Sequence, residues 1–234
     1  MLTLDFKNDI RFIFNKLKEK NHFSFSKYAD GEYAVLRNIK ITNTDKWTFD
    51  PTIHTAEQQL LMDSFVYNHD DYYVGISCPC CQPKENVQWM RDTVKTKNVT
   101  YANIFVNSNY DFFKNHFISE FNKWDGKVIF IGNEKGSKNK LPFKVDYYHP
   151  IQIGSWLNPD LSNILEIMKN LCAKENNQLF LFSAGPLGNI LAHQLHLINK
   201  NNTYIDIGST VNPWIVGNNR RYLTGKNNKI CKWN

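Results

Sequence analysis

Apolar residues recur along the chain with two different periods. Residues 4–20 place a set of them at helical spacing, namely Phe6, Ile10, Ile13, Phe14 and Leu17. Residues 23–28 instead alternate between aromatic and polar side chains, which is typical of a strand. The same two patterns take turns along the rest of the chain. They predict helices over residues 55–67, 85–95, 109–124, 159–174 and 189–199, and strands over residues 72–76, 101–106, 127–132, 143–148, 178–183 and 203–207.

The last third of the chain contains a complete strand–helix–strand unit. Residues 178–183 form its first strand, residues 184–188 a glycine-containing turn, and residues 203–207 its second strand. A crossover of this kind joins parallel strands through a right-handed connection. Strands alternate with helices throughout, and neither a repeat nor a linker interrupts them. We therefore expect one α/β domain over residues 1–234, a three-layer Rossmann-like fold with a mostly parallel sheet.

Charge narrows the range of partners. The 234-residue chain carries a net charge of +6, and part of the excess lies in a basic tail over residues 218–234, which has five basic residues and no acid. Positive charge favours nucleotide diphosphates, nucleic acid or an acidic membrane surface, without choosing among them. The chain shows neither a signal-peptide pattern nor an apolar run of roughly 20 residues. We expect a cytoplasmic protein, with attachment to a membrane surface left open.

The five cysteines do not form a disulfide framework, because their number is odd and their spacing uneven. The segment Cys78-Pro-Cys-Cys81 suggests a metal site. Structural zinc needs four ligands, usually in two spaced pairs. The remaining cysteines are Cys172, inside a predicted helix, and Cys231, in the basic tail. The sequence therefore does not favour zinc at this segment.

An acidic triplet, Asp30-Gly31-Glu32, follows the strand predicted over residues 23–28 and precedes a helical pattern. Ligands of open α/β sheets bind at the carboxyl ends of strands. Two carboxylates around a glycine in a turn can hold Mg²⁺ or Mn²⁺, which prefer oxygen ligands and are shared with substrate phosphates. Taken alone, the same triplet is also common in solvated turns.

Two further segments end predicted strands at the same edge. Ser183-Ala-Gly-Pro-Leu-Gly188 joins a strand to a helix, with Pro186 suited to the first helical position and glycines that allow close approach of a ligand. It matches neither the dinucleotide-binding glycine pattern nor the P-loop. A tight turn for packing is the alternative. Asp206-Ile-Gly-Ser209 ends the next strand, where Asp206 either orients a sugar hydroxyl, acts as a base, or caps the turn.

Several of these segments carry a family resemblance that spans about residues 20 to 222. Residues 23–32, Phe-Ser-Phe-Ser-Lys-Tyr-Ala-Asp-Gly-Glu, resemble the opening motif of GT-D-type glycosyltransferases, whose hallmark is a D-x-E motif. Residues 182–192 and 204–209 are similar to the second half of that group, and residues 213–214 and 220–222 to members that build surface polysaccharides. The sequence departs from the pattern at three positions: Lys27 stands where arginine is common, Ala29 where glycine is common, and Ser209 where some members have histidine.

The resemblance implies a glycosyltransferase that uses a UDP-sugar and Mn²⁺ or Mg²⁺. Asp30 and Glu32 would hold the metal and the donor diphosphate, and Asp206 would complete the catalytic set. The substrate-binding residues would be Lys27, Tyr28, Gly31, Ser183, Gly185, Pro186, Gly188, Gly208, Ser209 and Arg221. The acceptor would be a glycan or a lipid-linked sugar, and no nucleic acid is expected. A nucleic-acid-binding protein and a catalytically silent scaffold remain the alternatives, and the sugar, the base, the stereochemistry and the oligomeric state stay open.

Overall fold

A single parallel sheet organises the chain. The computed structural model describes residues 2–44, 46–157, 159–217, 220–223 and 230–232. Within them, seven strands form one sheet in the order β5-β4-β1-β9-β8-β6-β7, and every neighbouring pair is parallel. The strands are β1 (Ser24–Lys27), β4 (Tyr72–Ile76), β5 (Val99–Tyr101), β6 (Val128–Asn133), β7 (Tyr147–Ile151), β8 (Leu179–Ser183) and β9 (Thr203–Asp206). The predicted α/β class with a parallel sheet is confirmed.

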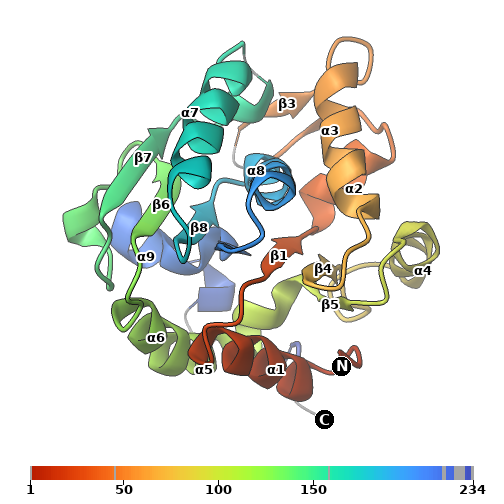
Figure 1. Cartoon of the computed structure of the whole chain (residues 1–234). Coiled ribbons are helices and arrows are strands. Elements are labelled where there is room, and N and C mark those ends of the chain that lie inside the picture. The colour runs from red at the N-terminus through yellow and green to blue at the C-terminus, as the bar shows by residue number, and fades with distance from the viewer. Residues whose placement is uncertain (1, 45, 158, 218–219, 224–229, 233–234) are drawn as a thin grey trace.

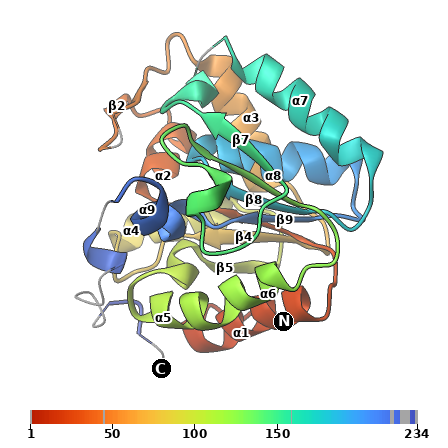
Figure 2. The same cartoon turned by 90° about the vertical axis from the view of Figure 1, so that its left-hand side faces the viewer.

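Helices cover both faces of the sheet, which gives three layers (Figures 1 and 2). One face carries α2 (Asp30–Leu36), α3 (Thr55–Val66), α7 (Leu161–Lys174) and α8 (Pro186–Ile198). The other carries α1 (Phe6–Lys18), α5 (Tyr110–Phe112), a π-helical turn (Phe113–Phe117) and α6 (Ile118–Asn122). The remaining α-helices of the described chain are α4 (Lys84–Thr93) and α9 (Asn212–Ile215). Because side chains alternate along a strand, Val74 packs into the first apolar layer and Tyr73 into the second.

Small polar residues on β1 let helix α8 pack directly over the sheet. Ser24 Oγ donates to the carbonyl of Ala192 at 3.1 Å, and Asn189 Nδ2 donates to Ser26 Oγ at 2.9 Å and to the carbonyl of Lys27 at 2.6 Å. These groups are buried, so each hydrogen bond prevents the cost of an unsatisfied polar atom. Asn189 thereby fixes the carboxyl end of β1 against α8.

The path of the chain places a crevice beside β1. From β1 the chain moves to β4 and β5 on one side, then crosses to β6 and β7 and returns through β8 and β9 on the other. The carboxyl ends of β1, β9 and β8 therefore meet where connections leave in opposite directions, which is where open α/β sheets bind ligands.

Local boundaries differ from the predictions in several places. The strand predicted over residues 101–106 lies earlier in the structure: β5, an edge strand, ends at Tyr101. From there the chain turns into a 3₁₀ helix, Ala102–Phe105. The strand predicted over residues 143–148 lies later, at β7, where Pro150 is tolerated on the other edge. The polar segment after α2 contains a small antiparallel pair, β2 (Ile41–Thr42) and β3 (Thr48–Phe49).

Of the predicted basic tail, residues 220–223 and 230–232 are described, whereas Lys226 and Lys229 lie outside the described residues. No helix in the described ranges combines the length and the apolar character needed to cross a bilayer.

Candidate active site

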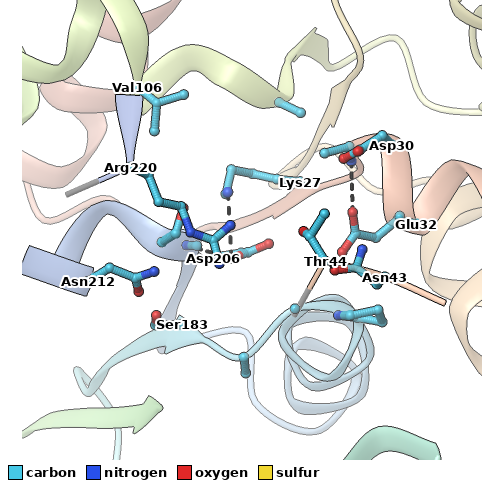
Figure 3. A pocket seen from close by; sticks show the side chains of 18 of the residues that line it. Lys27, Asp30, Glu32, Asn43, Thr44, Val106, Ser183, Asp206, Asn212 and Arg220 are labelled. Atoms are coloured by element: carbon cyan, nitrogen blue, oxygen red, sulfur yellow. Dashed lines mark hydrogen bonds and ion pairs between the residues drawn. The ribbon is translucent and has the colours of Figure 1, made fainter. Parts of the chain in front are cut away.

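A cavity of about 700 Å³ opens at the carboxyl edge of β1, β6, β8 and β9 (Figure 3). Most of the predicted site residues line it, although they are far apart in the sequence. They are Lys27, Asp30, Gly31, Glu32, Ser183, Gly185, Pro186, Asp206, Gly208 and Ser209. The structure therefore brings together the ends of three strands that the sequence analysis expected to share one edge.

Tyr28 is one predicted substrate-binding residue that the structure places elsewhere. Its side chain is fully buried, and its hydroxyl bonds to Ser64 Oγ at 2.8 Å and accepts from Ser26 Oγ at 3.1 Å. Since Asn189 in turn donates to Ser26, a buried chain of hydrogen bonds links α8, β1 and α3 beneath the cavity. Tyr28 therefore supports the floor of the site and does not line it.

Gly188 and Arg221 do not line the cavity either. A Cβ atom on Gly188 would lie 3.1 Å from Cβ of Phe182 and 3.6 Å from Cγ of Asp206, so this glycine lets α8 pack closely on β8 and β9. Arg221 is exposed, and its neighbours Arg220 and Tyr222 line the cavity instead. The hydroxyl groups of Tyr222 and Ser209 lie 2.7 Å apart, and this contact holds residues 220–223 against the end of β9.

Lys27 and Asp206 form an ion pair at the centre of the site. The Lys27 Nζ atom lies 4.0 Å from Asp206 Oδ1, and the side chains are 16% and 5% exposed. Asp206 Oδ1 also accepts the backbone N–H of Gly208 at 2.9 Å. Burial raises the pKa of the Asp206 carboxyl, while the positive charge of Lys27 and the Gly208 hydrogen bond oppose that rise. Figure 3 shows this pair between the acidic triplet and Ser183.

Glycine suits position 208 for two reasons. Its φ angle is +55°, which side chains other than glycine rarely adopt. A Cβ atom there would also lie 2.2 Å from Nζ of Lys27. The glycine thus leaves the space that the lysine ammonium occupies beside Asp206.

The acidic triplet lies in the first turn of α2, and this corrects the prediction of a turn before the helix. Asp30 and Glu32 are the first and third residues of the helix. Residues two apart on a helix leave it in different directions, so the two carboxylates approach a shared ion less directly than they would in a turn. Glu32 Oε2 accepts the backbone N–H of Ala29 at 3.0 Å (Figure 3), which caps the helix start.

Gly31 lies between these two carboxylates and has a packing role. A Cβ atom on it would lie 2.7 Å from Nδ2 of Asn43 and 3.3 Å from the ring of Trp47. The glycine therefore lets the segment that links β2 and β3 approach the start of α2 and close one side of the cavity.

Glu32 has an unusual protonation equilibrium. Burial raises its pKa to about 7, and the negative charge of Asp206 adds to the rise. Backbone N–H groups of Glu32 and Ala29 and the charge of Lys27 act in the opposite direction without cancelling it. Glu32 therefore exchanges a proton near neutral pH, which is unusual for a carboxyl group and typical of functional sites.

The cavity lining offers part of the ligand set of a divalent metal ion. Asp30 and Glu32 provide the carboxylate oxygens that Mg²⁺ and Mn²⁺ prefer. In the described chain, however, no third His, Cys, Asp or Glu joins them in a ligand cluster. Such an ion would take its remaining ligands from water and from the phosphates of a substrate, which is the usual arrangement for Mg²⁺.

Helix α8 opens onto the cavity at Gly185. Gly185 precedes the helix with φ +57° and ψ −142°, and Pro186 occupies the predicted first helical position. This backbone geometry is available to glycine and strained for other residues. The start of a 13-residue helix carries partial positive charge and suits a phosphate group.

Sequence reasoning missed a second group of lining residues. Trp47 and Trp156 meet edge to face with ring centroids 5.3 Å apart, and Trp156 Nε1 is buried with no partner in the described structure. The other lining residues include eight with an amide or a cationic side chain: Asn43, Asn103, Asn107, Asn133, Lys135, Gln152, Asn212 and Arg220. Aromatic rings beside amide groups are well suited to sugars and bases. Only residues 220–222 had a sequence signal, through the resemblance of that segment.

Comparisons with known proteins support the fold. No protein-family model matches the sequence, and no curated protein matches it. A solved structure described as "The highly conserved domain of unknown function 1792 has a distinct glycosyltransferase fold" matches with a TM-score of 0.57 and 15% identity, over 86% of this chain and 77% of that one. A selenomethionine-substituted structure of domain of unknown function 1792 (DUF1792) matches with a TM-score of 0.56, the same identity and the same coverage. The chain therefore shares the fold of these domains, as the motif resemblance implied.

Proposed function

We propose that this chain, which has a glycosyltransferase fold, transfers a sugar from a nucleotide-diphosphate donor to a glycan or lipid-linked acceptor. UDP-sugars are the proposed donors, and surface polysaccharide or glycoprotein glycans the proposed products. The observation that carries the proposal is the cavity, where Asp30, Glu32, the Lys27–Asp206 pair and the start of α8 meet at one edge of the sheet.

The donor diphosphate would bind between Lys27 and the start of α8. Lys27 supplies a full positive charge that a buried carboxylate holds in place, and the start of α8 supplies partial positive charge. Lysine provides a point charge, so it suits a diphosphate whose oxygens are also held by other groups. Asp206 keeps Lys27 in position and faces the same cavity as a partner for a sugar hydroxyl.

A divalent ion would supply charge neutralisation of the departing diphosphate when it is bound. Asp30 and Glu32 are the residues of this chain that would hold it, with Asp30 exposed at the first helical position and Glu32 fixed by its hydrogen bond to Ala29. Trp47 and Trp156, which lie beside the start of α2, would shield the reaction from water.

Thermal unfolding with a panel of UDP-, GDP-, CMP- and dTDP-sugars, with and without Mn²⁺, tests the proposal. We expect UDP-sugars with Mn²⁺ to raise the melting temperature, because a ligand that binds the native state stabilises it. Asp30→Asn should remove the Mn²⁺-dependent part of this shift. The matched control is Asp70→Asn, since Asp70 is exposed and does not line the cavity.

Transfer of sugar from a radiolabelled UDP-sugar to lipid-linked acceptors then measures turnover. The proposal is wrong if no nucleotide sugar shifts the melting temperature of the wild-type chain. It is also wrong if Asp30→Asn behaves as Asp70→Asn in both assays.

A further inference from the structure

Four of the five cysteines come together beside the cavity. Cys78, Cys80 and Cys81 follow β4, and Cys231 comes from the far end of the chain. All four Sγ atoms lie within 4.8 Å of one another. Five of the six Sγ···Sγ distances are 3.1 Å for Cys78–Cys80, 3.7 Å for Cys78–Cys231, 4.0 Å for Cys80–Cys81, 3.6 Å for Cys80–Cys231 and 3.7 Å for Cys81–Cys231.

These distances are close to those between four thiolates that bind one tetrahedral metal ion. A disulfide would bring two sulfurs to about 2.0 Å, and none of the four is in a disulfide. Four thiolates at a Zn–S distance of about 2.3 Å lie about 3.8 Å from one another at the corners of a tetrahedron. A polynuclear iron–sulfur cluster divides its cysteine ligands among several iron atoms and so spreads the sulfurs farther apart.

The surroundings of the sulfurs are those of a metal-thiolate centre. Asn103 Nδ2 donates to Cys78 Sγ at 3.6 Å, and Asn107 Nδ2 donates to Cys231 Sγ at 3.3 Å. Such outer hydrogen bonds orient ligands and stabilise the negative charge of thiolates. Phe6 and Tyr101 pack against buried Cys78 and Cys231, while Cys80 and Cys81 are exposed and provide a route for the ion.

We propose that Cys78, Cys80, Cys81 and Cys231 bind one structural Zn²⁺ ion, with release of their thiol protons. With four protein ligands the site is closed, which is the arrangement of structural and not of catalytic zinc. The sequence did not favour this site because Cys231 stands 150 residues after Cys81. The parallel sheet places the end of β4 where the C-terminal segment returns, and only the folded chain shows the fourth ligand.

The ion would fasten the C-terminal segment to the wall of the cavity. Ser108 donates twice to the carbonyl of Ile230, and Asn109 donates to the carbonyl of Cys231. Cys81 and Ile230 both line the cavity. Zinc would therefore stabilise this wall, and its binding does not depend on the proposed transferase activity.

Metal content of the purified full-length chain tests the proposal directly. After expression in zinc-supplemented medium and purification under reducing conditions, mass spectrometry should find about one zinc per chain, as a closed four-thiolate site requires. Cys231→Ser and Cys80→Ser should each lower the zinc content severalfold. Cys172→Ala is the matched control, because Cys172 lies in α7 away from the cluster, and it should retain the zinc.

Cobalt substitution of the wild-type chain gives a second measurement that does not depend on the folding of a variant. Tetrahedral Co²⁺ bound by thiolates produces intense visible absorption and sulfur-to-metal charge-transfer bands, and Zn²⁺ should displace it. The proposal is overturned if the wild-type chain contains no zinc and gives no such spectrum. It is also overturned if Cys231→Ser and Cys80→Ser keep the full zinc content.

Discussion

Lys27 and Asp206 join the carboxyl ends of two neighbouring strands through an ion pair with an Nζ–Oδ1 distance of 4.0 Å. The pair is largely buried, so neither charge is well hydrated. An incoming diphosphate would offer Lys27 additional negative charge. The pair therefore holds the Lys27 ammonium in position for an anionic ligand. When no such ligand is bound, the Asp206 carboxylate balances the charge of Lys27.

Replacement of Lys27 by methionine should weaken the binding of UDP. The change removes a charge-assisted contact to phosphate, which is worth about 1.5–3 kcal/mol and so about tenfold or more in affinity. Isothermal calorimetry with UDP checks this. Lys27→Arg should retain most of the affinity because it keeps the charge. Lys200→Met is the surface control, since Lys200 is exposed and does not line the cavity. Equal affinity of Lys27→Met and wild type would remove Lys27 from the proposed site.

Gly208→Ala should affect both stability and binding. The alanine must adopt a φ of +55°, which costs about 1–2 kcal/mol, and its methyl group would displace the Lys27 ammonium. Chemical denaturation and UDP calorimetry measure the two effects. Gly217→Ala is a matched control, because Gly217 has a φ of +66° and no atom of the described residues lies within 4 Å of the added Cβ. It should lose similar stability and keep its affinity for UDP. A Gly208→Ala chain with normal affinity would contradict the proposed position of Lys27.

The sequence predicted the elements that depend on local pattern. Strands β4 and β8 follow from short apolar runs and helices α1 and α7 from apolar periodicity, and the order of strands and helices led to the parallel sheet. The start of α2 was missed although a signal was present. Glu32 stands three residues after Ala29, which is the spacing of a helix-capping carboxylate, but Ala29 is not a usual capping residue.

Contacts between distant segments could not be predicted in this way. Cys231 joins three cysteines near residue 80, and Trp156 packs against Trp47 from a distant part of the chain. Periodicity carries no information about such pairs, because they depend on where the connections of the sheet return. The same limit explains the error at Tyr28, which has the expected position in a motif but directs its side chain into the apolar core just after β1.

Glu32→Gln should stabilise the chain at alkaline pH while it lowers activity. The carboxyl group has a pKa of about 7 in the folded state and a normal, lower value when unfolded. The unfolded state therefore loses its proton first as pH rises, and stability falls between about pH 4.5 and 7. Glutamine keeps an oxygen for the Ala29 N–H without the buried charge, so we expect a gain of about 1–3 kcal/mol at pH 8 and little at pH 4.

Denaturation of wild type and Glu32→Gln at several pH values measures this difference. Asp63→Asn is the control, because Asp63 is exposed on α3, and its effect should not change with pH. A constant difference between wild type and Glu32→Gln across the range would show that Glu32 has an ordinary pKa. If Glu32→Gln is more stable and fully active, the carboxylate has no functional role.

His196→Leu should make the chain less sensitive to acid. His196 is fully buried on α8, and neither of its ring nitrogens has a partner among the described residues. Burial lowers its pKa to about 3, with further lowering by positive charge on His69, Lys200 and His193. An unfolded histidine binds a proton below about pH 6.5, so the wild-type chain loses stability as pH falls through this range, by up to about 1.4 kcal/mol per pH unit for one group. Leucine removes this dependence, so urea denaturation between pH 7 and 5 should show a smaller fall in the free energy of unfolding than in wild type.

The exposed residue His116 provides the control, His116→Leu, which should follow wild type. Parallel curves for His196→Leu and wild type would mean that acid unfolding begins at another group.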